Sequence, residues 1–348
     1  MRTEFFYPVK SSEGSGDASG VSGKQKKILI IGGAGYVGSA LTPELLRKGY
    51  EVVVYDLYLY GDVFGNLRSR NLVEIKGDIR DKNRLLSAGV GVDQIIHLAC
   101  ISNDPSFELN PKLGRSINYD AFPNVIEAVK ANGVKRLIYA SSSSVYGVKS
   151  GEVTEDVELA PLTDYARYKM ECERILEESG INYVMVRPAT VCGYAHRLRL
   201  DLVVNILTIH ALVNRKIRII GEHLLRPNIN IKDMVRIYEC LLEADDDLVC
   251  GQVFNTGHQN MTVGEIARLI VEVLGDKGMV LENVKTDDIR SYHVNSEKIK
   301  HVLGFEYKYS VGEAILSLKT AFGQGLIIDG LNNPLYYNVK LMQKINLE

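Results

Sequence analysis

The chain has 348 residues, and its hydrophobic fraction of 46% is enough for a substantial core in one large domain or two closely joined ones. The formal net charge of −2 excludes an overall basic surface for nucleic acid or an acidic membrane. Five cysteines without a C-x-x-C pair predict reduced thiols rather than a disulfide framework or a zinc site, and neither a signal peptide nor a membrane-spanning run is recognisable, so a cytoplasmic protein without a metal is expected.

The first 26 residues are predicted to form a flexible leader, because residues 11–23 are mostly Ser, Gly and small polar residues. A continuous apolar run at 27–31 then predicts a parallel strand that is covered on both faces. Similar runs recur at 51–55, 72–75, 93–99, 136–140 and 182–186, with helical patterns between several of them. This alternation predicts an α/β fold with a doubly wound parallel Rossmann sheet, whose ligands lie at the carboxyl ends of the strands.

A glycine-rich G-x-x-G-x-x-G turn at 32–38 directly follows the first strand. The missing side chains let backbone N–H groups approach a pyrophosphate, and the next helix directs its positive end at the phosphates. Asp56 ends the second strand, where a carboxylate binds an adenosine ribose and repels a 2′-phosphate, which favours NAD over NADP. The glycines alone also fit a turn that only joins strand to helix closely. Pro43 lies inside that helix and is expected to bend it or end it early.

Tyr165 and Lys169 are four residues apart and share one face of a predicted helix. A nearby ammonium favours the phenolate and lowers a tyrosine pKa that is ordinarily about 10, and the positive ring of an oxidised nicotinamide adds to this effect. Such a base removes a hydroxyl proton while hydride leaves the same carbon for the nicotinamide. Tyr and Lys are also common on solvated helix faces, so a surface pair is the alternative.

Four serines at 141–144 follow the strand at 136–140, where hydroxyls face the expected ligand but also form ordinary turns. Asp78 follows another strand and is either a helix cap or a neighbour of the adenine. Glycine turn, serines and Tyr/Lys helix occur in the order that a single active site requires.

These residues resemble the extended short-chain dehydrogenases/reductases, in particular the NAD-dependent epimerase/dehydratase group that acts on nucleotide sugars. The resemblance extends from residue 27 to residue 331 and rests on G-G-A-G-Y-V-G at 32–38, G-D-I-R at 77–80, H-L-A at 97–99, S-S-S-V-Y-G at 142–147, Y-x-x-x-K at 165–169 and R-P at 187–188. It implies NAD as cofactor and a nucleotide-diphosphate sugar as substrate. It also implies a homodimer that packs the helix through 125–131 and the helix with Tyr165, although an apolar face on either helix is equally explained by the sheet.

The resemblance makes Tyr165 the general base, Lys169 its electrostatic partner and ribose ligand, and Ser142 the hydroxyl that bonds the substrate oxygen. The cofactor-binding residues that it implies are Gly32, Gly35, Tyr36, Val37 and Gly38 at the pyrophosphate, Asp56 and Leu57 at the ribose, Asp78 and Ile79 at the adenine, and Leu98, Ala99, Asn118, Tyr165, Lys169 and Pro188 elsewhere along the dinucleotide or its surroundings. The implied substrate-binding residues are Ser142, Asn205, Arg226 and Arg290. The last three are equally explained as surface charges or caps.

Departures from the family pattern narrow the reaction. The 4,6-dehydratases of the family carry an Asp-Glu pair after the catalytic hydroxyl residue, and uronate decarboxylases carry a glutamate at the second place, whereas Ser143 and Ser144 stand here. Serine does not titrate near neutrality, so neither the elimination nor that decarboxylase pattern is supported. Thr190 stands in place of an asparagine of galactose epimerases and Asn230 in place of a histidine, which leaves the sugar open.

The favoured function is an NAD-dependent nucleotide-sugar epimerase, most simply a 4-epimerase with a 4-keto intermediate, because it needs no further acid or base. The alternative is a nucleotide-sugar oxidoreductase that forms or reduces a keto sugar, and the sequence does not separate the two. A non-catalytic dinucleotide-binding regulator is disfavoured by the retained Ser142, Tyr165 and Lys169.

Two domains are predicted, because the buried-strand pattern loosens past Arg187. The NAD-binding Rossmann domain covers 27–192, with 229–258 returning to it. A smaller α/β substrate-binding domain covers 193–228 and 259–335, and residues 336–348 form a C-terminal tail.

Overall fold

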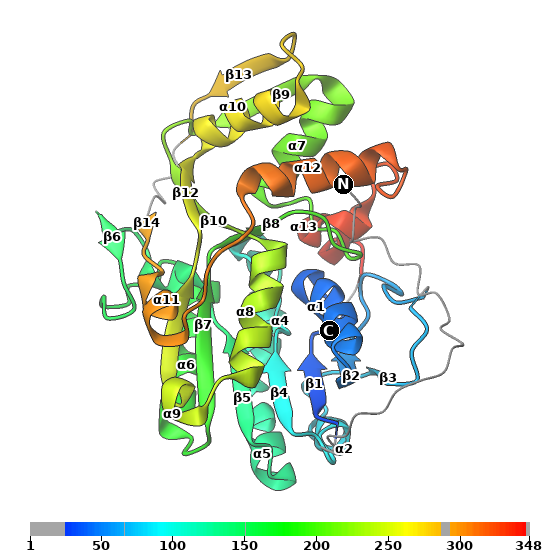
Figure 1. The fold of residues 1–348 in the computed structure, drawn as a ribbon, viewed down its shortest axis with the longest axis vertical. Helices are drawn as coiled ribbons and strands as arrows, with labels where there is room; N and C mark the ends of the chain where they lie inside the picture. The colour runs from blue at the N-terminus through cyan, green and yellow to red at the C-terminus, as the bar shows by residue number, and fades with distance from the viewer. Residues whose placement is uncertain (1–24, 66, 150, 287–292, 346–348) are drawn as a thin grey trace, which may run out of the picture.

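The computed structural model describes residues 25–65, 67–149, 151–286 and 293–345. Seven parallel strands form its central sheet, in the order β11-β7-β5-β4-β1-β2-β3 (Figure 1). The strands are β1 Lys27–Ile31, β2 Glu51–Asp56, β3 Leu72–Lys76, β4 Gln94–His97, β5 Arg136–Ala140, β7 Tyr183–Pro188 and β11 Gln252–Thr256. The predicted Rossmann fold is confirmed. Most of the predicted leader and Arg290 lie outside the described residues.

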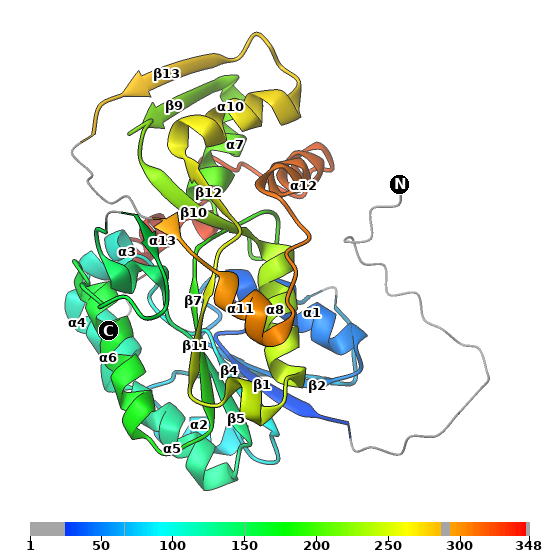
Figure 2. The ribbon, with the colours of Figure 1, turned by 60° about the vertical axis from the view of Figure 1, so that its left-hand side comes forward.

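The strand sequences are continuously apolar because successive residues enter two different cores. Ile28 and Ile30 of β1 belong to a core with α1 (Tyr36–Arg47) and α8 (Ile231–Glu243). Leu29 and Ile31 belong to the other core, with α2 (Lys82–Ala88), α5 (Phe122–Asn132) and α6 (Asp164–Glu178). Figure 2 shows the sheet between these two groups of helices. Both faces are therefore buried, as parallel sheets require.

Helix α1 continues past Pro43 to Arg47, so the expectation that proline would end this helix early is wrong. Proline removes one backbone donor but leaves the remaining hydrogen bonds of the helix available. Leu41 and Leu45 flank it, are fully buried and pack in the core that α1 shares with α8. Tertiary packing on both sides of Pro43 thus offsets the local cost.

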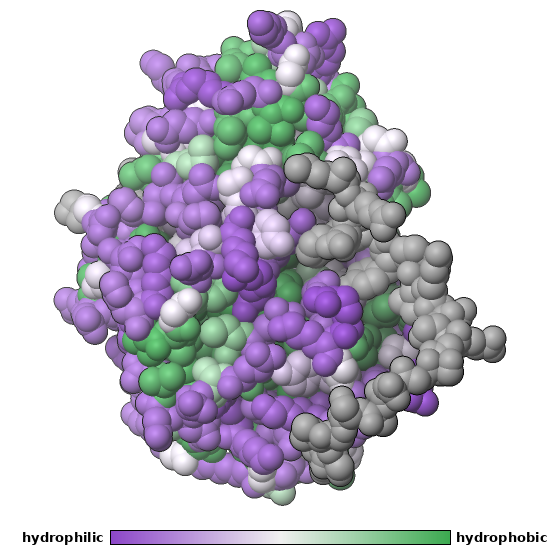
Figure 3. All heavy atoms as spheres, in the orientation of Figure 1, coloured by the Kyte–Doolittle hydropathy of each residue, from purple (hydrophilic) through white to green (hydrophobic). Residues whose placement is uncertain are grey.

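A second group of elements lies above the carboxyl ends of the sheet (Figure 1). Helices α7 (Val203–Asn214), α10 (Val263–Leu274) and α12 (Val311–Gly323) share a core with β9 (Lys216–Ile220), which pairs with β13 (Val280–Val284). A three-stranded sheet joins β12 (Gln259–Thr262), β10 (Leu225–Asn230) and β8 (Thr190–Cys192). On the face in Figure 3, hydrophobic residues gather in this upper part among hydrophilic ones.

Short elements complete the described chain and bring its end to the sheet. They are α3 Asp104–Glu108, α4 Pro111–Arg115, the π-helix Ser116–Asp120, the 3-10 helix Ser143–Tyr146, α9 Asp246–Val249, α11 Glu297–Leu303 and the pair β6 Glu152–Val153 with β14 His293–Val294. The chain ends with a 3-10 turn, Pro334–Tyr336, and α13, Asn338–Met342. Because α13 contacts α3, the C-terminal residues lie beside the loop that follows β4.

Candidate active site

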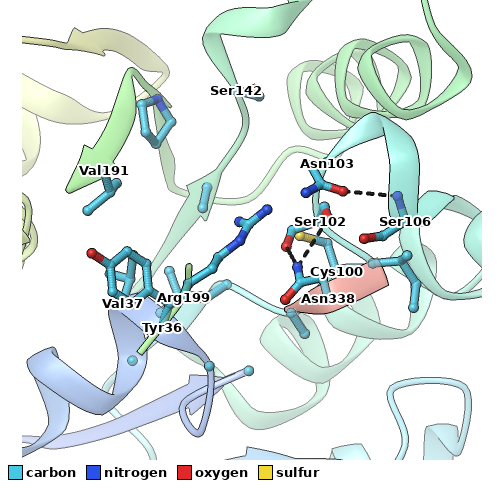
Figure 4. Close-up of a pocket in the computed structure, with 18 of the residues that line it drawn as sticks. Tyr36, Val37, Cys100, Ser102, Asn103, Ser106, Ser142, Val191, Arg199 and Asn338 are labelled. Atoms are coloured by element: carbon cyan, nitrogen blue, oxygen red, sulfur yellow. Dashed lines mark hydrogen bonds between the residues drawn. The ribbon is translucent and has the colours of Figure 1, made fainter. Parts of the chain in front are cut away.

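A pocket opens at the carboxyl ends of the central strands (Figure 4). It lies at β1, whose neighbours in the sheet are β2 on one side and β4 on the other. This reversal of strand order is the place where doubly wound sheets bind ligands. The residues predicted from the sequence that line its wall are Gly32, Gly35, Tyr36, Val37, Gly38, Asp56, Leu57, Ile79, Leu98, Ala99, Ser142, Tyr165 and Pro188.

The glycine-rich turn lies against backbone atoms and leaves no room for side chains. A Cβ at Gly32, where φ is +84°, would stand 2.4 Å from the backbone nitrogen of Ala99, and a Cβ at Gly38 would stand 2.4 Å from the carbonyl oxygen of Gly33. Helix α1 begins at Tyr36 without a side-chain cap, so its first N–H groups stay available to a ligand. This cradle fits the pyrophosphate of a dinucleotide.

Asp56 ends β2 beside this cradle. Its Oδ2 accepts a hydrogen bond from the N–H of Ala34 (3.0 Å), and its Oδ1 accepts one from the N–H of Tyr58 (2.8 Å). Burial raises the pKa of Asp56, while these hydrogen bonds oppose the rise. Each carboxylate oxygen keeps a further lone pair, so the residue fits the ribose hydroxyls of NAD.

Asp78 lies apart from the pocket wall and pairs with Arg80. The two side chains form an ion pair of 2.7 Å. Burial raises the pKa of Asp78, but the hydrogen bonds and charge of Arg80 outweigh burial and hold this pKa below its ordinary value. Its backbone carbonyl accepts a hydrogen bond from the hydroxyl of Tyr55 (2.7 Å), so Asp78 braces the wall in which Ile79 lies.

The Ser142 and Tyr165 side chains both line the pocket wall, and the nearby Ser142 hydroxyl lowers the pKa of Tyr165, although burial raises it more. Ser142 follows β5, and its Oγ accepts hydrogen bonds from the N–H of Ser144 (3.1 Å) and from the hydroxyl of Ser144 (2.8 Å). Both acceptor positions of the Ser142 oxygen are thereby used, which directs its own O–H outward as a donor. Thr163 caps the start of α6 and fixes the position of Tyr165 in the first turn.

Lys169 lies one turn beyond Tyr165 on α6, buried behind the pocket wall. Its Nζ donates a hydrogen bond to the carbonyl of Ala140 (2.6 Å) and lies 4.9 Å from the centre of the Tyr139 ring. Burial raises the pKa of Tyr165 above its ordinary value, and Arg199 is the cation in the protein that opposes this rise most. Lys169 is not among the groups with the largest effect on this pKa.

Two residues that were predicted near the cofactor or the substrate form hydrogen bonds with other residues of the protein. Asn118 is buried, and its side-chain amide both accepts from the N–H of Ile101 (2.8 Å) and donates to its carbonyl (3.0 Å). Asn205 is 0% exposed, and it accepts from the N–H of Gly193 (2.9 Å) and donates to the hydroxyl of Tyr36 (3.1 Å). Both residues shape pocket loops rather than line the wall.

Arg226 lies on β10, outside the pocket wall, and its Nη1 donates to the carbonyl of Leu225 (3.1 Å). Asn230, in the position of the family histidine, caps α8 and binds the carbonyl of Ser310 (2.9 Å). Ser143, Ser144 and Thr190 do line the pocket. The departures from the dehydratase pattern are thus located at the site itself.

Among the wall residues that sequence reasoning missed are Tyr60, Arg197, Arg199 and Asn338. The two arginines alternate with the buried Leu198 and Leu200 in the loop between β8 and α7, and this alternation is the signal in the sequence that could have found them. Figure 4 shows Arg199 reaching into the pocket. Asn338 carried no such signal.

The described residues contain no cluster of three or more His, Cys, Asp or Glu side chains suited to a metal ion. No helix in this part of the chain is long and apolar enough to cross a membrane.

Comparisons with known proteins agree with this geometry. The uncharacterized UDP-glucose epimerase YtcB of Bacillus subtilis (strain 168) is 30% identical over 72% of this chain and 83% of its own length. The UDP-glucose 4-epimerase of Lactobacillus helveticus is 27% identical over 81% and 92%. A crystal structure of the Thermotoga maritima UDP-glucose 4-epimerase with UDP-glucose superposes with a TM-score of 0.75 at 26% identity, covering 86% of this chain and 99% of that one.

A model of the NAD dependent epimerase/dehydratase family matches residues 28–257. These residues include the glycine-rich turn, Asp56 and the Ser142–Tyr165 pair. The chain therefore belongs to the NAD dependent epimerase/dehydratase family.

Proposed function

We propose that this chain is an NAD-dependent nucleotide-sugar 4-epimerase. The observation that carries the proposal is that Ser142 and Tyr165 line one pocket with the glycine-rich turn and have Ser143 and Ser144 beside them. UDP-glucose 4-epimerases among the relatives support a nucleotide sugar as substrate.

The cofactor would be held by the glycine-rich turn at its pyrophosphate, by Asp56 at its ribose and by Pro188 near its nicotinamide. When bound, NAD supplies the hydride acceptor and donor of the reaction. Tyr165 takes the proton of the sugar hydroxyl, and Ser142, whose O–H is directed outward by Ser144, bonds the same oxygen. After the keto sugar has turned, return of the hydride to the other face of the same carbon and of the proton from Tyr165 to its oxygen would give the epimer.

The groups beside this pair favour epimerisation over elimination. Ser143 and Ser144 do not titrate near neutrality, so Tyr165 is the acid/base residue in this part of the wall. Reversible oxidation at one carbon needs no second acid or base. A net oxidoreductase uses the same residues and differs only in whether the keto sugar turns or leaves.

The deciding experiment incubates the purified full chain with NAD and a panel of UDP-, dTDP- and GDP-sugars. Product stereochemistry is followed by NMR, and reduced nicotinamide by absorbance. We expect one sugar to reach an epimer equilibrium without net formation of reduced nicotinamide. Stoichiometric reduced nicotinamide or free keto sugar, without epimer, would establish the oxidoreductase instead.

We also propose the organisation of the molecule. The Rossmann domain of 27–192 with 229–258 and the substrate domain of 193–228 and 259–335 would close on the pocket between them.

A homodimer would pack α5 and α6, which contact each other on one face of the sheet (Figure 2). Light scattering with size-exclusion chromatography tests the dimer. Five free cysteines support a reducing, cytoplasmic location.

A further inference from the structure

Arg197 lies in the loop between β8 and α7, with 4% of the residue exposed, and lines the pocket. Its Cζ lies 3.6 Å from the centre of the Tyr60 ring, and its Nη2 donates a hydrogen bond to Oδ1 of Asn338. Its backbone N–H donates to Oγ of Ser39 (3.0 Å), in the first turn of α1. Arg197 is therefore fixed at the end of the pocket where α1 begins.

The charge of Arg197 has no carboxylate within ion-pair distance among the described residues. Its side-chain partners, Asn338 and the Tyr60 ring, are neutral, and its Nε is buried without a hydrogen-bond partner. Burial lowers the pKa of Arg197, as expected for a guanidinium without full compensation. Because a buried charge is costly unless it is paired, this arrangement implies an anion supplied by a ligand.

The surroundings of Arg197 indicate which anion this is. Ser39 belongs to the turn of α1 whose N–H groups face a pyrophosphate. The charge of Arg197 also opposes the rise that burial causes in the pKa of Asp56, the residue at the ribose position. The guanidinium therefore lies at the phosphate and ribose end of the cofactor site, not at the Ser142–Tyr165 end.

We propose that Arg197 is a ligand of the NAD pyrophosphate, and that Asn338 is the positioning residue that holds its guanidinium in the pocket. The inference rests on NAD as cofactor and not on the epimerase reaction. It makes α13, near the end of the chain, a part of the cofactor site.

Asn338 is suited to this task because it joins three pocket loops. Its Oδ1 accepts from Arg197 and from the hydroxyl of Tyr60 (2.9 Å). Its Nδ2 donates to Oγ of Ser102 (2.8 Å), and its backbone N–H donates to Oδ2 of Asp201 (3.2 Å). With 2% of the residue exposed, it is also protected from competing water. Loss of this amide would free the guanidinium to leave the pocket.

Arg199 provides the matched control. It lies two residues further along the same loop and lines the same pocket, but its Nε donates to Oδ1 of Asp201 (2.7 Å) and its charge acts on Tyr165. An arginine that is already paired with a carboxylate and lies near the reacting end is not expected to bind the pyrophosphate.

The test measures binding of adenosine, ADP, NAD and NADP to the full chain by isothermal titration calorimetry, without any sugar. We expect Arg197→Gln to weaken ADP and NAD by about 10- to 100-fold and adenosine by less than about 2-fold. Arg199→Gln should leave the ratio of ADP to adenosine affinity within about 2-fold of wild type. Asn338→Ala should weaken ADP by about 3- to 10-fold, and Asn338→Asp by more, because a carboxylate would neutralise Arg197.

Circular dichroism and thermal unfolding establish that each variant is folded. An unchanged ratio of ADP to adenosine affinity in folded Arg197→Gln overturns the proposal. A loss of affinity for NADP alone, with the affinities for ADP and NAD unchanged, overturns it as well. If Arg197→Gln does not fold, an unchanged ratio in folded Asn338→Asp overturns it in the same way. Because no turnover is measured, the outcome is independent of whether the chain proves to be an epimerase.

Discussion

Two walls of the pocket are built in different ways. The catalytic wall, defined by the proposed catalytic residues Ser142 and Tyr165 with Lys169 behind them, stands on the end of β5 and the first turns of α6. The loop wall, Arg197, Arg199 and Asn338, stands on the irregular β8–α7 loop and on the five-residue helix α13. Regular elements hold reacting groups with the tight geometry that proton and hydride transfer require, whereas loops adapt to a ligand.

The support behind each wall differs as well. Behind the catalytic wall, the buried Arg187 and Glu173 form an ion pair of 2.6 Å, and the Ser141 hydroxyl donates to the same carboxylate. Behind the loop wall, the neutral amide of Asn338 joins the loops. A buried charged network thus supports the proposed reacting groups, whereas a single neutral amide supports the proposed ligand of the cofactor.

The largest effect is expected at the catalytic wall. Tyr165→Phe should lower kcat by about 10³-fold, within the usual contribution of a general acid or base, and should leave NAD affinity within about 2-fold. Turnover is measured with the sugar nucleotide that the panel identifies, and NAD binding by calorimetry. Undiminished turnover in this variant would refute the assignment of Tyr165 as the base.

The support of that wall is tested through its ion pair. Arg187→Met should lower the free energy of unfolding by about 3 to 5 kcal/mol, because Glu173 would remain buried without its cation. The exposed pair of Arg174 with Glu171 supplies the control, and Arg174→Met should cost less than about 1 kcal/mol. Urea unfolding measures both. A similar small cost for both variants would contradict a rigid support for the catalytic wall.

The decrease in the free energy of unfolding at acid pH is expected to depend on His97, which ends β4 beneath the catalytic wall. Burial, helped by the charge of Lys169, lowers the pKa of His97 to about 3, against about 6.5 in the unfolded chain. The unfolded chain therefore binds the proton first, and stability should fall by about 2 kcal/mol between pH 7 and pH 5. His97→Gln should flatten this part of the profile, which urea unfolding at each pH measures. An unchanged slope would mean that His97 is not the group responsible.

A smaller loss of stability than that of Arg187→Met is expected at the loop wall. Asn338→Ala should lower the free energy of unfolding by about 1 to 3 kcal/mol, because it removes buried hydrogen bonds to Ser102, Tyr60 and Arg197. Because the variant is also expected to bind NAD less tightly, saturating NAD should stabilise it less than wild type, and the difference in stability should widen. A loss as large as that of Arg187→Met would remove the contrast between the two walls.

The sequence by itself determined the sheet, the glycine-rich turn and the spacing of Tyr165 and Lys169, whereas Ser142 was singled out by the family resemblance. Each has a local physical cause: apolar runs require burial on both faces, glycines permit the close approach at Gly32, and a spacing of four places Tyr165 and Lys169 on one helix face. These signals lie within a few residues of each other, so they can be read without the fold.

Only the tertiary structure decided which polar side chains face the pocket and which face the protein. Asn205 was expected at the substrate and is enclosed by its own loop, whereas Asn338, nearly 300 residues after Asp56 and absent from every motif, reaches the cofactor end of the pocket. Pro43 stays helical for a related reason, because packing against α8 offsets the local cost. Contacts between distant segments depend on how layers stack, and no spacing within the sequence records that.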